Sequence, residues 1–171
     1  SPGGSAYISE QIWRQVVELK KVKPVVVSMG NVAASGGYYI SCAANKIIAE
    51  PNTLTGSIGI FGMFPNASGL FGKLALTTDI VKTNTFSDLG DLSRPMTESE
   101  KALIQGYVER GYQTFLSRCA EGRGMTTEAV NAIGQGRVWT GEQAKERGLV
   151  DELGGIELAI STAAGLADLD Q

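Results

Sequence analysis

Apolar residues recur along the first third of the chain in patterns typical of helices and of buried strands. Residues 12–20 carry Ile, Trp and Val at helical spacing, and Ser9 can cap this helix. A continuous apolar run over 25–29 is typical of a strand that is buried on both faces. A helix over 36–44 and a short strand over 46–49 follow. This alternation predicts βαβ crossovers and a largely parallel sheet.

The middle of the chain predicts shorter elements and one long loop. We expect a glycine-punctuated strand over 55–62, a short helix over 67–74 and a strand over 78–83. Residues 84–95 carry turn and breaker residues and predict a long mobile loop.

Helix caps organise the last third of the chain. Thr97 and Glu100 form a capping box for a helix that runs to about residue 122. Further helices are expected after Thr126, after a second capping box at Thr140, and over 156–166, with an extended piece at 137–139. The long helix carries one apolar stripe, suited to a core or a subunit contact. Its members are Leu103, Ile104, Tyr107, Val108, Tyr112, Phe115 and Leu116.

Length and composition restrict the functional class. The 171 residues suffice for one domain with a full core, over residues 1–171. Fifteen Lys and Arg residues against 18 Asp and Glu give a net charge of −3, which argues against a nucleic-acid partner. No apolar run approaches the roughly 20 residues of a membrane span. The chain begins at a turn motif without Met, so we expect a piece of a longer protein, with any membrane anchor elsewhere.

The chain contains no histidine and only two cysteines. Cys42 and Cys119 lie far apart without CxxC spacing, so two buried thiols and a disulfide both remain open. A zinc or iron site is not expected, and we expect no cofactor. Without histidine, no Ser-His-Asp relay can operate within this chain. A nucleophilic serine would need a lysine or an external base.

Ser35 is the candidate nucleophile. Its neighbours in VAASGGYYI (residues 32–40) are small, and it stands where a buried strand meets a helix, at the sheet edge where α/β folds build their sites. The Gly36 N–H is well placed to donate to an oxyanion, and Gly3 or Gly4 of the opening turn could add a second N–H. An ordinary helix N-cap serine also fits this pattern.

Four ordered motifs together resemble the signal peptide peptidase A (protease IV) family of the Clp-protease/crotonase-like superfamily. They are SPGG at 1–4, VSMGNVAASGGYYI at 27–40, TLTGSIG at 53–59 and GRVWTGEQAKERGLVDELG at 136–154. The resemblance covers essentially the whole chain. It implies an α/β fold of repeated β-β-α units with a mostly parallel sheet. It also implies a serine endopeptidase of the Ser–Lys dyad type that degrades cleaved signal peptides.

The resemblance assigns roles to individual residues. Ser35 takes the position of the nucleophile, and Gly36 with Gly3 or Gly4 takes the position of the oxyanion hole. Ser57 matches the serine that hydrogen-bonds and orients the catalytic lysine. Without the resemblance, Ser57 would read as a turn residue.

The family lysine is missing from its expected position. Aligning the segment after the 78–83 strand puts Ser87 there, and the nearest lysine, Lys82, falls in the expected strand. A serine hydroxyl is too weak a base to replace a neutral lysine. Duplicated family members carry the serine in the C-terminal half and the lysine in the N-terminal half. The resemblance therefore implies a C-terminal half that is inactive alone, with Lys82 as the second candidate for the base.

Partners, location and alternatives follow from the same resemblance. It implies a homo-oligomer that includes the N-terminal half, located at the bacterial inner membrane with the catalytic part facing the periplasm. Membrane contact would come only through an anchor outside this chain. A crotonase-type acyl-CoA enzyme would share the fold, but no acidic pair faces the glycine-rich loops. A catalytically degenerate domain for oligomerisation or peptide binding is the other alternative, although Ser35 and Ser57 are both retained.

Overall fold

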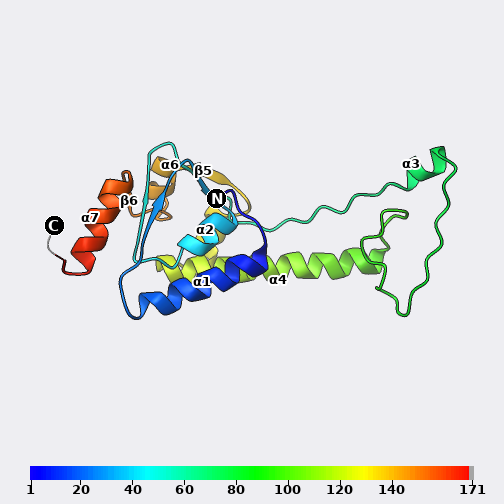
Figure 1. Cartoon of the computed structure of the whole chain (residues 1–171), viewed down its shortest axis with the longest axis horizontal. Helices are drawn as coiled ribbons and strands as arrows, with labels where there is room; N and C mark the ends of the chain where they lie inside the picture. The colour runs from blue at the N-terminus through cyan, green and yellow to red at the C-terminus, as the bar shows by residue number, and fades with distance from the viewer. Residues whose placement is uncertain (170–171) are drawn as a thin grey trace. The chain divides into compact units, whose positions relative to one another are not determined.

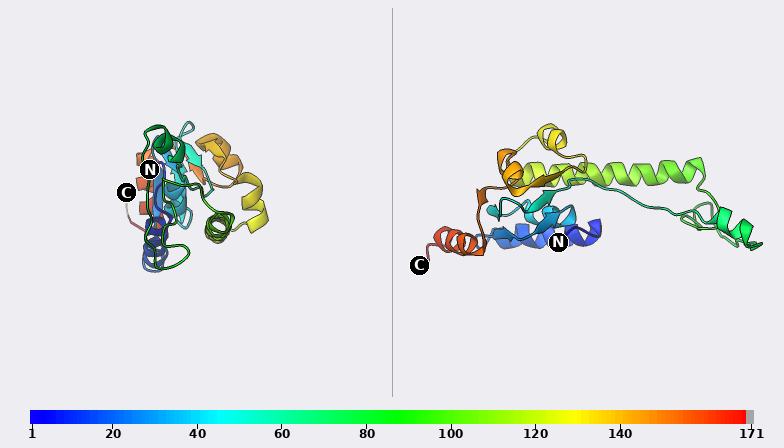
Figure 2. Two further views of the ribbon diagram at one scale, coloured as in Figure 1. Left: turned by 90° about the vertical axis from the view of Figure 1, so that its right-hand side faces the viewer. Right: turned by 90° about the horizontal axis from the view of Figure 1, so that it is seen from above.

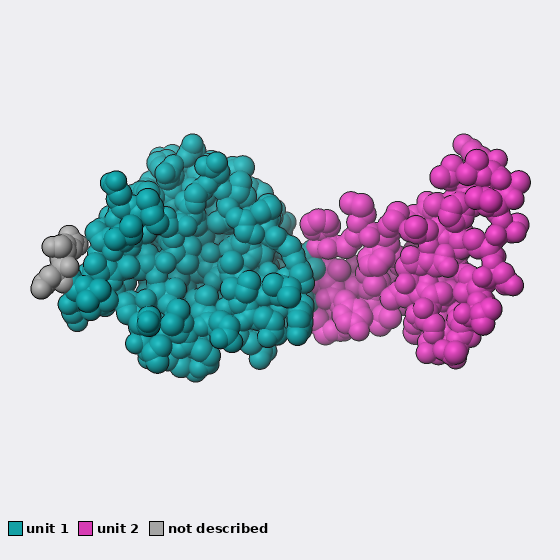
Figure 3. Space-filling model, viewed as in Figure 1, with its two compact units in different colours: residues 1–60, 111–171 teal, residues 61–110 magenta. Residues whose placement is uncertain are grey.

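The computed structural model describes residues 1–169, and the chain divides into two compact units (Figure 3). Unit 1 contains residues 1–60 and the chain from residue 111 onward, and unit 2 contains residues 61–110. The long helix α4 (Glu98–Arg123) contributes to both units.

Unit 1 contains two small three-stranded sheets (Figure 1). Sheet A is parallel and has the order β1-β3-β6, and sheet B has the order β2-β4-β5, with β2 and β4 parallel and β5 antiparallel. The first two strand pairs, β1 with β2 and β3 with β4, thus each send their first strand to sheet A and their second to sheet B, whereas β5 joins sheet B and β6 joins sheet A. All pairings except that of β4 with β5 are parallel, which confirms the expected mostly parallel fold. The strands are β1 (Val26–Met29), β2 (Val32–Ala34), β3 (Lys46–Ala49), β4 (Leu54–Gly56), β5 (Val138–Thr140) and β6 (Glu152–Leu153).

Helices cover the sheets of unit 1 and enclose its core (Figures 1 and 2). The helix α1 packs on α2, α6 packs on β4 and β5, and α7 packs on β1 and β3. Tyr38, Phe115, Ile47 and Leu149 are among the fully buried side chains, and the Tyr38 hydroxyl donates to the Leu149 carbonyl at 2.9 Å. The helices are α1 (Ala6–Lys20), α2 (Gly36–Ser41), α5 (Thr127–Ile133), α6 (Gly141–Glu146) and α7 (Ile156–Leu166).

Unit 2 is built around an ion-pair network rather than an apolar core. Besides α3 (Ser68–Lys73) and the start of α4, it consists of irregular chain. Arg94 Nη2 bridges Asp88 Oδ2 at 2.8 Å and Glu100 Oε1 at 2.6 Å. Among residues 1–169, no member of the buried apolar cluster belongs to unit 2. Many of its large apolar side chains are exposed: Phe61, Met63, Phe64, Leu70, Leu74, Leu76, Val81, Phe86, Leu92 and Tyr107.

The structure confirms the predicted caps of the later helices. The Thr97–Glu100 capping box closes in both directions, with Glu100 Oε2 2.7 Å from the Thr97 N and Thr97 Oγ1 3.3 Å from the Glu100 N. The box at Thr140 and Gln143 forms as well, and Thr126 caps α5.

Four expectations for the elements are wrong. The strand expected over 55–62 corresponds to β4, which already ends at Gly56. The N-cap of α1 is Ser5, whose hydroxyl accepts from the Ile8 N–H, while Ser9 lies inside the helix and donates to the Ser5 carbonyl at 2.9 Å. Residues 78–83 form no strand, because nothing pairs with their backbone, and Val81 is 98% exposed. The segment before Ser35 forms a separate strand, β2, and α2 ends earlier than expected.

Candidate active site

The two candidate serines lie side by side at the carboxyl ends of neighbouring parallel strands. The last pair in the β2–β4 register is Ala34 with Gly56, and Ser35 and Ser57 are the next residues on each strand. The Ser35 N–H donates to the Gly56 carbonyl at 2.9 Å, which ties the two strand ends together. The carboxyl ends of parallel strands are where α/β folds place their functional groups.

Both serines adopt backbone conformations that L-residues rarely take. Ser35 has φ 52° and ψ −120°, and Ser57 has φ 49°. Such conformations cost on the order of 1–3 kcal/mol each and persist only where the surroundings impose them. Both residues are half-buried, and within residues 1–169 neither hydroxyl has a hydrogen-bond partner. The structure thus gives Ser35 no N-cap bond and leaves its hydroxyl available for chemistry.

The opening SPGG turn lies directly against Ser35. The Ser1 nitrogen donates to the Val32 carbonyl at 2.7 Å, and the Ala34 N–H donates to the Ser1 carbonyl at 3.0 Å, as in a parallel ladder. A Cβ on Gly3 would lie 2.8 Å from the Ser35 Cβ. The two glycine-rich segments named from the sequence therefore do come together.

The backbone donors around Ser35 differ in their availability. The Gly3 N–H donates to Ser1 Oγ at 3.3 Å. Within the described part of the chain, the N–H groups of Gly4 and Gly36 have no acceptor. A Cβ on Gly36 would lie 3.2 Å from the Gly4 nitrogen, so these two backbones are in contact. Gly4 and Gly36 therefore offer two free backbone donors beside Ser35.

Lys82, the candidate base within this chain, and Ser87, at the family lysine position, both belong to unit 2, whereas Ser35 and Ser57 belong to unit 1. The Lys82 ammonium forms an ion pair with Asp88 at 3.0 Å, and the Ser87 hydroxyl donates to Asn84 Oδ1 at 2.9 Å. In the described part of unit 1, no hydrogen bond or ion pair of a lysine reaches Ser35.

A charged network holds the helix that begins after Ser35. The Tyr39 hydroxyl donates to Glu10 Oε2 at 2.6 Å, and Arg118 Nη2 donates to Glu10 Oε1 at 2.9 Å, which links α1, α2 and α4. Burial alone would raise the pKa of Glu10, but hydrogen bonds from Arg118, Tyr39 and Arg14 outweigh it and lower that pKa to about 2. Burial and the bond to Glu10 raise the pKa of Tyr39.

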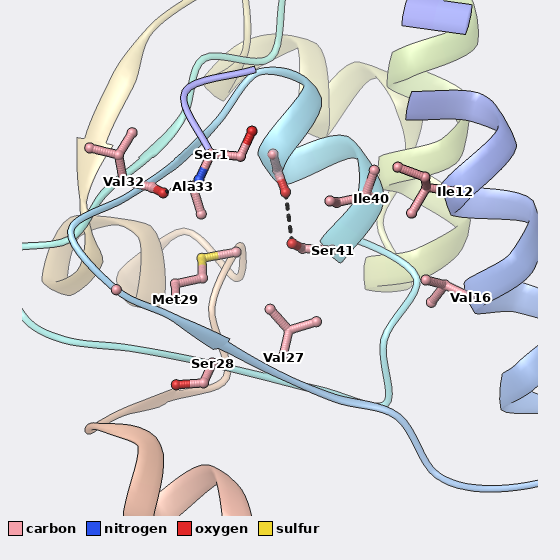
Figure 4. Close-up of a pocket in the computed structure, with 12 residues that line it drawn as sticks. Ser1, Ile12, Val16, Val27, Ser28, Met29, Val32, Ala33, Ile40 and Ser41 are labelled. Atoms are coloured by element: carbon pink, nitrogen blue, oxygen red, sulfur yellow. Dashed lines mark hydrogen bonds between the residues drawn. The ribbon is translucent and has the colours of Figure 1, made fainter. Parts of the chain in front are cut away.

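A pocket of about 310 Å³ runs along β1 in unit 1 (Figure 4). Its walls are mostly apolar and come from α1, β1, β2 and α2, and the Ser41 hydroxyl donates to the Gly37 carbonyl at 2.7 Å on one side. Ser1 lies at one end, while Ser35 does not line it. Ser57 does not line it either, so this pocket is separate from the candidate site at Ser35 and Ser57.

Residues 1–169 contain no group of three side chains suited to hold a metal ion. None of their helices combines the length and the apolar character that a membrane crossing needs.

Comparison with solved protein structures identifies the fold of this chain. A mutant of the 1510-N membrane-bound stomatin-specific protease has a TM-score of 0.57 at 16% identity, over 99% of this chain and 69% of its own. A ClpP1 mutant from Listeria monocytogenes has a TM-score of 0.55 at 18% identity, over 94% of this chain and 72% of its own. At these identities the likeness shows the fold alone, a Clp-protease-like α/β fold.

Sequence comparison is more specific. The sequence model of peptidase family S49 matches residues 17–170, and the chain belongs to this family. Protease 4 of Salmonella typhi is 44% identical over 172 residues, which cover 100% of this chain and 28% of that protein. The chloroplastic serine protease SPPA of Arabidopsis thaliana is 39% identical over 170 residues, which cover 99% of this chain and 25% of that protein. The chain thus spans about a quarter of the length of these relatives.

Proposed function

We propose that this chain is the nucleophile-bearing part of a serine endopeptidase, with Ser35 as the nucleophile. The observation that carries the proposal is the strained backbone of Ser35, which leaves its hydroxyl without a partner beside two free backbone donors. Strain of this kind collects at functional sites. Membership of a peptidase family and the name of the Arabidopsis relative, a serine protease, support the same activity.

The reaction follows from these groups. Ser35 Oγ attacks the carbonyl carbon of the scissile peptide bond while a neutral lysine amine takes its proton. The negative charge moves to the carbonyl oxygen, where the N–H groups of Gly36 and Gly4 stabilise it, with Gly3 as the alternative second donor. The C–N bond then breaks as the lysine gives the proton to the leaving amine, and Ser35 remains acylated. The lysine next takes a proton from water while the water oxygen attacks the acyl carbon, and the bond from Ser35 Oγ to that carbon breaks as the proton passes to Ser35.

The base in this proposal is a lysine from another domain. Ser57 lies beside Ser35 with a free hydroxyl, as needed to orient an incoming amine. Lys82 is the alternative base, although its ammonium is engaged by Asp88. An amine activates the serine only when it is neutral, and an ion pair opposes that state.

Substrate, assembly and location belong to the proposal as well. The family resemblance supports cleaved signal peptides as substrates and a location at the inner membrane, facing the periplasm. The exposed apolar side chains of unit 2 support assembly, because a unit without an apolar core gains stability when a partner covers such a surface. We propose that the partner is the N-terminal half of the same protein in a homo-oligomer.

Labelling with a serine-reactive fluorophosphonate tests the proposal. This chain alone should label slowly, and supplying the residues that precede Ser1 in the parent gene should restore rapid labelling. Ser35→Ala should abolish labelling in the complete protein. Ser28→Ala is the matched control, because Ser28 is an exposed serine on β1.

Two results would count against the proposal. Rapid labelling of the isolated chain that is lost in Lys82→Ala would make Lys82 the base. Undiminished labelling and peptide cleavage by the Ser35→Ala protein would remove Ser35 as the nucleophile and favour a degenerate domain.

A further inference from the structure

A tight loop at the start of the fourth sequence motif, at Gly136 and Arg137, pairs with the backbone at Ser57. The Ser57 N–H donates to the Arg137 carbonyl at 2.8 Å, and the Gly136 N–H donates to the Ile58 carbonyl at 2.8 Å. These bonds continue the antiparallel pairing of β4 with β5 past the end of β4. The backbone of Ser57 is therefore held by the backbone of Arg137.

The same loop contacts the residue that anchors Ser35. A Cβ on Gly56 would lie 2.9 Å from Trp139 Cδ1 and 3.1 Å from the Arg137 carbonyl oxygen. The Gly56 carbonyl in turn accepts the Ser35 N–H at 2.9 Å. The Arg137–Trp139 segment thus contacts Gly56 and binds the Ser57 N–H, and Gly56 in turn binds the Ser35 N–H.

The side chains of this segment are fixed by the end of α5. Arg137 donates from Nη2 to the Ala132 carbonyl at 2.8 Å and from Nε to the Gly134 carbonyl at 3.0 Å. Trp139 Nε1 donates to the Ile133 carbonyl at 2.9 Å. Three successive carbonyls that a helix end leaves without internal partners therefore each receive a side-chain N–H. We call this arrangement the α5 clamp.

We propose that Arg137 is a positioning residue that holds Ser57 in place to orient the dyad lysine, an inference that rests on the proposed function. Ser57 and Gln135 are non-glycine residues with positive φ, at 49° and 58°, so there is backbone strain on both sides of this pairing. Strained backbone persists only when its surroundings over-determine it. The guanidinium supplies that constraint, because its rigid fork joins two carbonyls at once.

Hydrogen exchange in this chain tests the clamp without any assay of activity. Arg137→Ala should speed exchange of the Ser57 amide by about tenfold, because the loop that accepts this N–H loosens. Trp139→Phe keeps a ring against Gly56 but removes Nε1, and should give a smaller increase. Arg14→Ala, which removes an exposed arginine of α1, is the control and should leave this amide unchanged.

Labelling kinetics in the complete protein test the consequence for catalysis. Arg137→Ala should slow Ser35 labelling by about tenfold, since small misplacements of a catalytic group have effects of this size. The pH midpoint of labelling should move in the same direction as in Ser57→Ala. The double variant Ser57→Ala/Arg137→Ala should label no more slowly than Ser57→Ala alone. A purely structural role for Arg137 would leave the pH midpoint in place.

The outcomes are separable. Either of two results would overturn the positioning role. One is an unchanged exchange rate of the Ser57 amide in Arg137→Ala, and the other is a double variant in which the effects of Ser57→Ala and Arg137→Ala on the labelling rate multiply. If Ser35→Ala leaves labelling intact, the proposed function fails while the exchange result for the clamp stands. If Arg137→Ala fails to fold, Arg137→Lys replaces it in both experiments. Lysine reaches one carbonyl instead of two, so an effect of about threefold is expected, and no effect would overturn the inference.

Discussion

Glu10 should stabilise unit 1 in a pH-dependent way, because its carboxylate accepts hydrogen bonds from Tyr39 and Arg118. Its pKa of about 2 in the folded chain compares with an ordinary value of 4.5. At about 1.4 kcal/mol per pKa unit, this difference corresponds to about 3 kcal/mol. Screening by solvent reduces that to roughly 1–2 kcal/mol for a carboxylate at the edge of the fold.

The sign of the pH dependence follows from the lowered pKa. The stabilisation is fully present above the unfolded-state pKa and is lost as the pH falls from about 5 to 2. Glu10→Gln removes the titrating group, so its free energy of unfolding should fall below that of the wild type by roughly 1–2 kcal/mol at pH 7. The difference should shrink steadily toward pH 2.

Urea unfolding followed by tryptophan fluorescence measures this difference, because Trp13 and Trp139 both lie in unit 1. Glu18→Gln on the same helix is the matched control. It removes only an exposed ion pair with Lys21 and should change the free energy of unfolding by a few tenths of a kcal/mol. A Glu10→Gln destabilisation that is equal at pH 7 and pH 3 would refute the electrostatic origin.

Three further predictions concern strain, packing and thiols. Ser35→Gly should raise the free energy of unfolding by about 1 kcal/mol, because glycine adopts the positive φ of this position without strain. Ser35→Ala keeps the strain and should not raise it, and urea titration compares the two variants. Gly122→Ala should destabilise the chain by at least 1–3 kcal/mol, because its Cβ would overlap the Cys42 carbonyl. Gly165→Ala, in open space on α7, should instead stabilise by about 0.5–1 kcal/mol by thermal melting. Cys42 and Cys119 are buried, and burial raises the pKa of Cys119, so a thiol reagent should react with both only as fast as the chain unfolds.

The elements that the sequence predicts correctly are those with local signals. The capping boxes at Thr97 and Thr140 lie entirely within their own segments, and both form as expected. The strand expected over 78–83 had suitable residues but lacked a neighbouring strand, which a local pattern cannot reveal. The strand β2 was missed because it is three residues long and two of them are alanine.

The candidate site likewise contains residues that the sequence predicts and contacts that it does not. Ser35, Gly3, Gly4 and Gly36 were named from the sequence, and the structure brings them together. The α5 clamp was missed although its motif was noted, because its bonds run from side chains to carbonyls only three to six residues earlier, at the end of α5. Such irregular side-chain bonds leave no periodic signal.

The position of Ser57 beside Ser35 follows from the β-β-α repeat itself. The chain lays β4 parallel to β2 with Ala34 opposite Gly56, so the residues that follow these two strand ends must be neighbours. A turn serine after one strand thereby becomes a partner for a serine in the preceding repeat. The repeat brings the two serines together, but it does not fix the directions of their hydroxyls. Those depend on the positive φ of both serines and on the contacts that maintain it, which lie in the SPGG turn for Ser35 and in the α5 clamp for Ser57. Motifs far apart in the sequence are therefore all needed to build one small site.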